Sequence, residues 1–346
     1  MAELDHWHPV LLSEHLRHRP AGVRLAGREI VLFRGRGGAV GALEDICPHR
    51  RMRLSLGSVV GDRLRCRYHG WTYDAAGNGE SPGTPKLHAC AAGYDVREAM
   101  GAVWVKSRGS DPAFPHFDVA GYLPMCTLRH TVKAPLELVL DNFCEIEHTP
   151  TTHELFGYPL EAMERVNVRF EPTETTVRVI NDGPAKPVPL PLRVVLGIRR
   201  WYQFNDDWTT HFSPVYSVYD HWWSDPATGR EGKVRWRIYI FFWPIGEQEV
   251  GITTFAFVRS MHIIVPLFVV KWFRGLMRTL LDKEIRLDVG ILEGLASTDP
   301  SIEGMKLSRF DRVLGLNRER LDRVYRGRPV GGPGADCGPG CHSRGA

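Results

Sequence analysis

Hydrophobic and polar positions alternate in short runs through the first third of the chain, and turn-forming residues separate the runs. Residues 30–33 and 39–43 flank the sequence Gly35-Arg36-Gly37-Gly38, which is typical of a β-hairpin. Further short strands are predicted at 63–67, 71–73 and 103–105. Because no helical periodicity interrupts these runs, residues 1–110 are predicted to form a small all-β domain.

The pattern changes after residues 107–115, where glycine and proline indicate a domain boundary. Apolar positions then recur at helical spacing in two segments, 136–148 and 276–295. Aromatic-rich stretches between them, such as 208–223 and 233–243, are predicted as long strands. This mixture predicts an α+β domain built on an antiparallel sheet over residues 111–328. The Gly- and Pro-rich residues 329–346 are expected to form a disordered tail.

Composition and charge exclude several classes of protein. The 44 basic and 40 acidic residues give a formal charge of +4 without any long basic run, which argues against nucleic acid as a partner. The first ten residues lack the features of a secretory signal, and the apolar stretch 263–270 is far shorter than the ~20 residues of a membrane span. Seven cysteines in so long a chain suit a reducing compartment. We therefore expect a cytoplasmic protein without membrane contact.

A candidate metal motif lies within the predicted β domain. Cys47-Pro48-His49 is followed, after sixteen residues, by Cys66-Arg67-Tyr68-His69-Gly70-Trp71. Two cysteines and two histidines on paired loops can hold a tetrahedral zinc ion. They can equally hold a [2Fe–2S] centre in which two histidines replace two cysteines on one iron. Spacing alone leaves both possibilities open.

A second group of candidate ligands lies in the predicted α+β domain. Three polar residues recur at every third position and are predicted to share one helical face: Asn142, Glu145 and His148. Pro150 disfavours helix at the preceding residue, so a turn there can bring His153 back towards His148. Because O2-activating Fe(II) is commonly bound by two histidines and one carboxylate, a third ligand is needed.

The predicted helix 276–295 supplies the carboxylate. Its apolar stripe is formed by Leu281, Ile285, Leu292 and Leu295. Asp288 lies in the middle of this stripe, and a carboxylate that faces a core is costly unless it is paired or bound to a metal. Asp288 is therefore the predicted third ligand, with Glu284 on the flank of the stripe as the alternative.

These motifs together resemble the catalytic (α) subunits of Rieske non-haem iron oxygenases of the monooxygenase type, over about residues 5–325. The resemblance implies that residues 1–110 form a Rieske domain and residues 111–328 a helix-grip (START-like) catalytic domain. It further implies that Cys47 and Cys66 hold one iron of a [2Fe–2S] cluster and that His49 and His69 hold the other. The Fe(II) ligands implied are His148, His153 and Asp288.

One residue departs from the family pattern, which has aspartate where this chain has Glu145. In the family this carboxylate links a cluster histidine of one subunit to an iron histidine of the next. The resemblance therefore implies that Glu145 connects His69 of one chain to His148 of another. Asn142 belongs to the same motif and is placed with Glu145 in the catalytic centre.

The resemblance implies an oxidoreductase that activates O2 for hydroxylation, demethylation or a related oxidation of a small apolar or ring-containing organic substrate. A separate ferredoxin or NAD(P)H-dependent reductase is expected, because no dinucleotide-binding fingerprint is evident. A homotrimer is also expected. The alternatives are an electron-transfer Rieske protein without O2 chemistry of its own and a zinc-stabilised binding module. Five further residues are not expected to be ligands: His211, His221, Cys337, Cys341 and His342.

Overall fold

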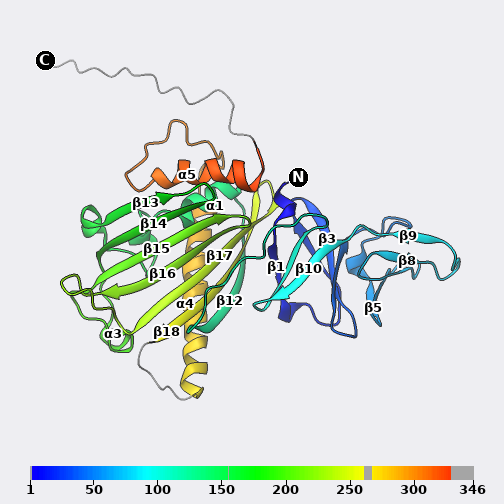
Figure 1. Cartoon of the computed structure of the whole chain (residues 1–346), viewed down its shortest axis with the longest axis horizontal. Helices are drawn as coiled ribbons and strands as arrows, with labels where there is room; N and C mark the ends of the chain where they lie inside the picture. The colour runs from blue at the N-terminus through cyan, green and yellow to red at the C-terminus, as the bar shows by residue number, and fades with distance from the viewer. Residues whose placement is uncertain (1, 155, 261–266, 329–346) are drawn as a thin grey trace.

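The computed structural model describes residues 2–154, 156–260 and 267–328. The predictions about residues 329–346, including Cys337, Cys341 and His342, lie outside the described residues, as does the start of the apolar stretch at 263–266. Figure 1 shows two parts side by side: small sheets built by the N-terminal third, and a large sheet with a long helix built by the rest. The predicted α+β class is confirmed.

The N-terminal part contains eleven short strands. They are β1 His8–Leu12, β2 Ala21–Leu25, β3 Arg28–Arg34, β4 Val40–Glu44, β5 Ser58–Val60, β6 Arg63–Arg65, β7 Thr72–Tyr73, β8 Asn78–Glu80, β9 His88–Cys90, β10 Tyr94–Ala99 and β11 Ala102–Ser107. They form three antiparallel sheets in the orders β1-β11-β10, β2-β3-β4 and β5-β6-β7-β8-β9. The predicted hairpin is confirmed, because β3 pairs with β4 with Arg34 opposite Val40.

The second part is built on one antiparallel sheet in the order β12-β18-β17-β16-β15-β14-β13. The bounds are β12 Leu123–Val132, β13 Asn167–Pro172, β14 Thr176–Pro184, β15 Gln203–Phe212, β16 Val215–Ser224, β17 Val234–Gly246 and β18 Glu249–Ser260. The single strand predicted at 208–223 is wrong, because the chain reverses at Ser213-Pro214 to form the β15–β16 hairpin. Proline cannot donate to a strand ladder, so it suits this turn.

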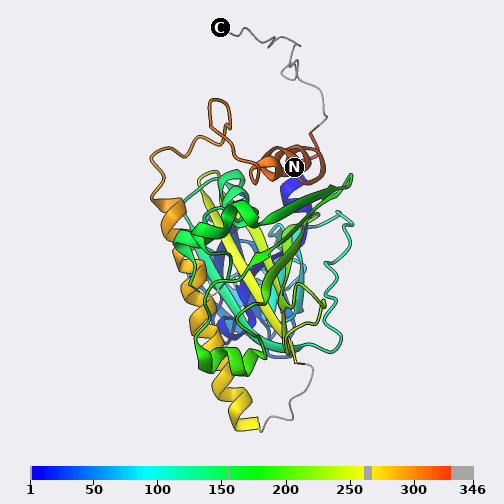
Figure 2. The ribbon, with the colours of Figure 1, turned by 90° about the vertical axis from the view of Figure 1, so that its left-hand side faces the viewer.

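The helices are α1 Leu136–Phe143, α2 Thr149–Thr152, α3 Leu190–Leu196, α4 Leu267–Glu293 and α5 Arg312–Arg320. Shorter helical turns are η1 Ala2–Asp5, η2 Ser13–His15, η3 Leu54–Leu56, η4 Leu160–Arg165 and η5 Leu321–Tyr325. Figures 1 and 2 show α4 running along one face of the large sheet. Within the described part of the chain, every helix is too short or too polar to cross a membrane.

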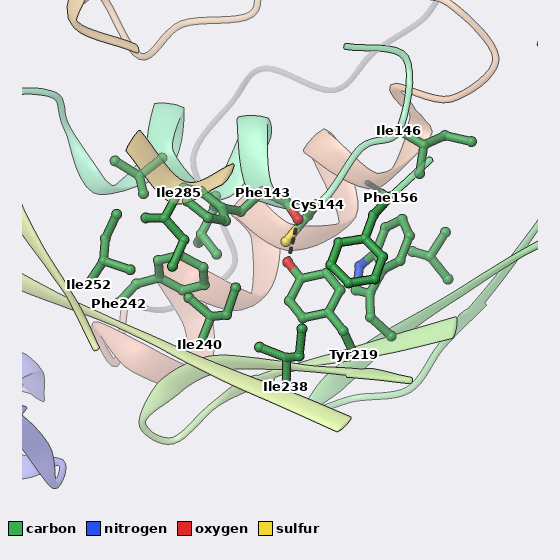
Figure 3. Packing of buried hydrophobic residues seen from close by; sticks show 14 of the residues in the cluster. Phe143, Cys144, Ile146, Phe156, Tyr219, Ile238, Ile240, Phe242, Ile252 and Ile285 are labelled. Carbon is green, nitrogen blue, oxygen red and sulfur yellow. Dashed lines mark hydrogen bonds between the residues drawn. The ribbon is translucent and has the colours of Figure 1, made fainter. Parts of the chain in front are cut away.

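The helix predicted at 136–148 ends early, at Phe143. In a continuing helix the Phe143 carbonyl would accept a hydrogen bond from the backbone N–H of Glu147. Instead the hydroxyl of Tyr219 donates to this carbonyl, as Figure 3 shows, and the Glu147 N–H donates to the carboxylate of Glu145. Asn142 and Glu145 therefore do not share one helical face with His148, and that prediction is wrong.

Two further helix boundaries differ from those predicted. The chain does not leave the helical conformation at Thr149, because α2 begins there and proline is tolerated in the first turn of a helix. The helix predicted at 276–295 is confirmed as part of α4, which begins at Leu267 and ends at Glu293. Leu295 thus lies beyond the helix and is exposed, whereas Leu281, Ile285 and Leu292 are buried as predicted.

Two hydrophobic clusters position the site. One fills the space between the large sheet and its helices, where Ile238, Ile240 and Tyr219 point from the sheet towards Phe143 and Ile285 (Figure 3). The other joins the two parts of the chain through Trp104 of β11. Its ring packs edge-on against Phe241 with ring centroids 4.9 Å apart. The sheet β1-β11-β10 therefore packs directly on the outer face of the large sheet.

Candidate metal centres and the adjoining cavity

The first candidate centre lies on two loops, one before β5 and one between β6 and β7. Cys47 and Cys66 are buried and in contact, while His49 and His69 are exposed with their ring centroids 4.6 Å apart. Backbone hydrogen bonds close both loops, from Cys47 N–H to the Met52 carbonyl (2.8 Å) and from Cys66 N–H to the Trp71 carbonyl (2.7 Å). The structure thus places two buried thiols beneath two solvent-facing imidazoles.

The spacing of this set favours a cluster over a single ion. Ligand atoms of one tetrahedral zinc lie roughly 3–4 Å apart, given Zn–S and Zn–N bonds of about 2.3 and 2.0 Å. Among the described residues, however, only His148, His153 and Asp288 bring three ligand atoms within 4.8 Å of one another. The four loop residues are therefore spread more widely than the ligands of one ion. Inner thiols and outer imidazoles fit the two unequal irons of a histidine-ligated [2Fe–2S] centre.

The second candidate centre joins the turn after α1 to the middle of α4. The Nε2 atoms of His148 and His153 lie 3.0 Å apart. Asp288 Oδ1 lies 3.3 Å from the first and 3.2 Å from the second, and the Asp288 side chain is only 6% exposed. The structure therefore brings together the three residues proposed as ligands, although 135 positions separate His153 from Asp288. Two imidazoles and a carboxylate converging on one point suit a divalent iron.

Each imidazole is held from behind by a further carboxylate. Glu145 Oε1 accepts a hydrogen bond from Nδ1 of His148, and Glu284 Oε2 lies 2.5 Å from Nδ1 of His153. Such outer carboxylates fix the ring so that its other nitrogen faces the metal. Glu284, considered above as an alternative ligand, therefore contacts the far side of His153, and Asp288 is the carboxylate that reaches both Nε2 atoms.

The carboxylates strongly affect protonation of the two rings. Burial alone would lower the pKa of both histidines. Contacts with Asp288 and Glu145 nevertheless raise the pKa of His148 to about 9, and contacts with Asp288 and Glu284 do the same for His153. The same contacts hold the pKa of buried Asp288 below its usual value. A divalent metal must therefore displace protons when it binds this site.

A cavity of about 100 Å³ opens beside the second centre. Apolar side chains from the sheet and helices form most of its wall: Phe143, Phe156, Trp208, Tyr219, Ile238, Ile240, Leu281 and Ile285. Several of these are visible in Figure 3. A mainly apolar cavity with a few convergent polar groups is typical of a small-molecule site.

The sequence analysis missed two polar residues of this cavity. His221 was expected to be structural or exposed, yet it lines the cavity with Asp206, and its Nε2 lies 3.0 Å from Asp206 Oδ1. No local signal in the sequence marks them, because Asp206 lies opposite His221 only once β15 and β16 pair. His211, by contrast, stacks on Tyr216, and burial lowers its pKa to about 4.

Glu145 also borders a second, wider groove on the outer surface. This groove encloses about 1620 Å³ and is lined by six carboxylates but only one lysine, Lys306. Asn142 lies in its wall, and the Asn142 side-chain oxygen has no hydrogen-bond partner within the described chain. Because Glu145 and His148 line both spaces, they lie in the wall between the groove and the inner cavity.

Comparison with known proteins agrees with this architecture. Residues 6–95 match the family model of the Rieske [2Fe–2S] domain. The chain is 30% identical over 188 residues to the chloroplastic protein TIC 55 of Pisum sativum, covering 50% of this chain and 34% of that protein. It is 26% identical over 244 residues to the 4β-methylsterol monooxygenase of Methylococcus capsulatus, with 63% of each chain covered. It therefore spans between a third and two thirds of these relatives.

Among solved structures, dicamba monooxygenase bound to 3,6-dichlorosalicylic acid matches with a TM-score of 0.79 and 20% identity. The match covers 94% of this chain and 99% of that protein. At this level of identity, the likeness establishes a shared fold over both parts of the chain.

Proposed function

We propose that this chain, which belongs to the Rieske non-haem iron oxygenases, activates O2 to oxidise a small, largely apolar organic substrate. The observation that carries the proposal is the convergence of His148, His153 and Asp288 beside an apolar cavity, in the same chain as a Rieske domain. An electron-transfer protein without O2 chemistry would need neither this ligand set nor the cavity.

The residues divide between two metal centres. In this proposal Cys47 and Cys66 hold the inner iron of the cluster, His49 and His69 the outer iron, and His148, His153 and Asp288 a ferrous ion. When bound, the cluster supplies single electrons, and the ferrous ion supplies the site of O2 activation. The carboxylate of Asp288 would offset part of the positive charge of the ion. Glu145 and Glu284 orient the imidazoles of His148 and His153. The apolar wall keeps bulk water from the reacting substrate.

Glu145 is proposed to connect the two centres across a subunit boundary. One of its oxygens already accepts the Nδ1 proton of His148, and the residue borders the outer groove. His69 of a second copy, docked in that groove, would donate to the same carboxylate. Asn142, which lines the same groove, is proposed to support this connection.

Charge and shape support a head-to-tail assembly of identical chains, with a homotrimer as the closed form. The loops around His69 expose Tyr68 and several arginines: Arg50, Arg51, Arg53, Arg65 and Arg67. The groove is acidic and is bordered by exposed apolar side chains from Ile291, Leu295, Met305 and Leu307. A basic loop with an aromatic tip therefore complements an acidic, partly apolar groove.

Electrons come from a separate ferredoxin or NAD(P)H-dependent reductase. The Rieske domain spans 1–110 and the catalytic domain 111–328. The described cysteines are free, as suits the cytoplasm. The substrate is a ring-containing compound that undergoes hydroxylation, demethylation or a related oxidation.

Substrate-dependent O2 consumption tests this function. The purified chain is combined with a ferredoxin and its NADH-dependent reductase, and ring compounds are screened for coupled O2 uptake and oxygenated product. The proposal expects a product that disappears in Asp288→Ala, which keeps the cluster spectrum. A cluster that is reduced and reoxidised while no compound is oxygenated would favour the electron carrier, and a colourless zinc protein would favour the binding module.

A further inference from the structure

The cavity beside His148 and His153 has a one-sided distribution of charge. Four carboxylates line it, whereas none of its lining residues is a lysine or an arginine. These carboxylates belong to Glu145, Asp206, Glu284 and Asp288. Lys186 approaches the same loop, but its Nζ donates to the carbonyls of Thr149 and His153 (2.6 Å each) and does not line the cavity. Three carboxylates around one divalent ion already exceed its charge, so the cavity wall stays negative after metal binding.

Asp206 and His221 form the polar end of this cavity. They lie opposite each other on β15 and β16, and their side chains are 10% and 9% exposed. The inward positions on either side of Asp206 are the buried aromatic residues Phe204 and Trp208. A carboxylate buried in such surroundings is costly unless it is hydrogen-bonded or paired. Its place in a cavity wall therefore points to ligand recognition.

The orientation of the pair determines what it can bind. Nε2 of His221 lies 3.0 Å from Asp206 Oδ1, yet this carboxylate oxygen makes no hydrogen bond within the described part of the chain. Nδ1 of His221 is also buried without a hydrogen-bond partner among the described residues. An unpartnered carboxylate oxygen accepts a hydrogen bond from a hydroxyl or an amine. A ligand carboxylate would instead meet an acceptor and further negative charge.

We propose that the cavity selects a largely apolar alcohol or amine, whose O–H or N–H is bound by His221 and Asp206, and rejects the corresponding carboxylic acid. This inference rests on the proposed function, because the cavity adjoins the proposed ferrous site, and it adds the chemical class of the substrate. Asp206 and His221 are the specificity-determining residues. The unfavourable placement of charge against an acid adds to the selection made by the hydrogen bond to an alcohol.

Matched ligand pairs test the inference without turnover. Dissociation constants are measured by isothermal titration calorimetry on the full chain, under argon, at pH 7.5. The probes are benzyl alcohol with benzylamine and benzoate, cyclohexylmethanol with cyclohexanecarboxylate, and 2-naphthylmethanol with 2-naphthoate. In at least one set, the alcohol or amine is expected to bind at least tenfold more tightly than the acid.

Variants assign this preference to the pair. Asp206→Asn keeps the shape but removes the charge, and it should reduce the preference at least fivefold, mainly by tightening binding of the acid. His221→Gln should weaken binding of the alcohol, and it replaces Asp206→Asn as the test if that variant does not fold. The matched control is Asp207→Asn. Asp207 is the next residue on β15, and its carboxylate pairs with Arg178 at 2.6 Å outside the cavity, so the preference should not change.

The outcomes separate this inference from the proposed function. A panel in which no alcohol or amine binds more tightly than its acid overturns the inference, as does an equal effect of Asp206→Asn and Asp207→Asn. Iron and sulfide contents are measured on the same samples. Absence of the mononuclear iron would contradict the proposed function, while an iron-loaded protein that prefers acids would contradict only the substrate class.

Discussion

Glu284 offers a sharp test of how the fold prepares the ferrous site. Its carboxylate lies 2.5 Å from Nδ1 of His153, and its other oxygen accepts the backbone N–H of Glu154 (3.1 Å). The carboxylate charge of Glu284 orients the imidazole of His153 and increases the basicity of that ring. Glu284→Gln preserves the shape of the side chain but removes this charge. Loss of such an outer carboxylate typically costs ~10–100-fold in metal affinity, or about 1.4–2.7 kcal/mol.

The pKa of His153 makes this effect depend on pH. In the metal-free chain contacts with Asp288 and Glu284 raise that pKa to about 9, so a metal must displace a proton at neutral pH. Apparent affinity should therefore increase with pH up to about 9 in the parent protein. Removing Glu284 lowers the pKa towards its ordinary value of 6.5, so the increase above pH 7 should be smaller. The difference in metal affinity between the parent protein and Glu284→Gln should therefore increase as pH rises.

The assay is anaerobic competition between the cluster-loaded protein and a chelator for Co(II), a spectroscopic stand-in for Fe(II), from pH 6.5 to 8.5. Glu154→Gln is the matched control, because it removes a carboxylate beside His153 that is exposed and, among the described residues, is paired only with Lys283. This control should bind Co(II) within about twofold of the parent protein. Equal affinity and equal pH dependence in Glu284→Gln and the parent would refute the orienting role of Glu284.

Further predictions address the other parts of the site. His69→Cys should keep a [2Fe–2S] cluster but lower its midpoint potential, because thiolate stabilises oxidised iron; an unchanged potential in a redox titration would show that His69 is not a ligand. With iron in excess, Glu145→Gln should retain both metals yet slow single-turnover cluster oxidation at least tenfold, whereas Glu145→Asp stays active. An unchanged rate in the fully loaded Gln variant would end the bridging role. In the metal-free chain the pKa values of His148 and His153 are raised, so protonation of these rings stabilises the folded state. This stabilisation is complete below pH 6.5 and is lost as pH rises through about 9. The Tm of the metal-free chain should therefore fall across that range. Trp104→Ala should lower the free energy of unfolding by about 3–5 kcal/mol in chemical denaturation, because this buried ring joins the two parts of the chain.

Local patterns made the two candidate ligand sets visible in the sequence. Cys47 and His49, like Cys66 and His69, lie within a few residues of each other, so their spacing is visible in the sequence. Asp288 could be chosen because it interrupts an apolar stripe that the structure confirms at Leu281, Ile285 and Leu292. Helical periodicity could not separate the roles of Asp288 and Glu284. Both are buried, and only the position of the folded His148–His153 turn shows which one reaches Nε2.

Features that depend on distant residues were not predictable. The end of α1 at Phe143 depends on the hydroxyl of Tyr219, which lies 76 positions further along the chain. The pairing of Asp206 with His221 depends on the turn at Ser213-Pro214, which the sequence analysis placed inside one strand. Alternation along that supposed strand therefore could not show that both residues face the cavity.

The most direct test of the central claim is the ratio of iron to acid-labile sulfide in the parent protein and in Asp288→Ala. A [2Fe–2S] cluster and one ferrous ion per chain predict a ratio of about three to two in the iron-loaded parent protein. Loss of Asp288 should lower the ratio to about one to one, while the visible spectrum and the EPR signal of the reduced cluster stay unchanged. A ratio of one to one in the parent protein, or of three to two in the variant, would contradict a ferrous site built on His148, His153 and Asp288.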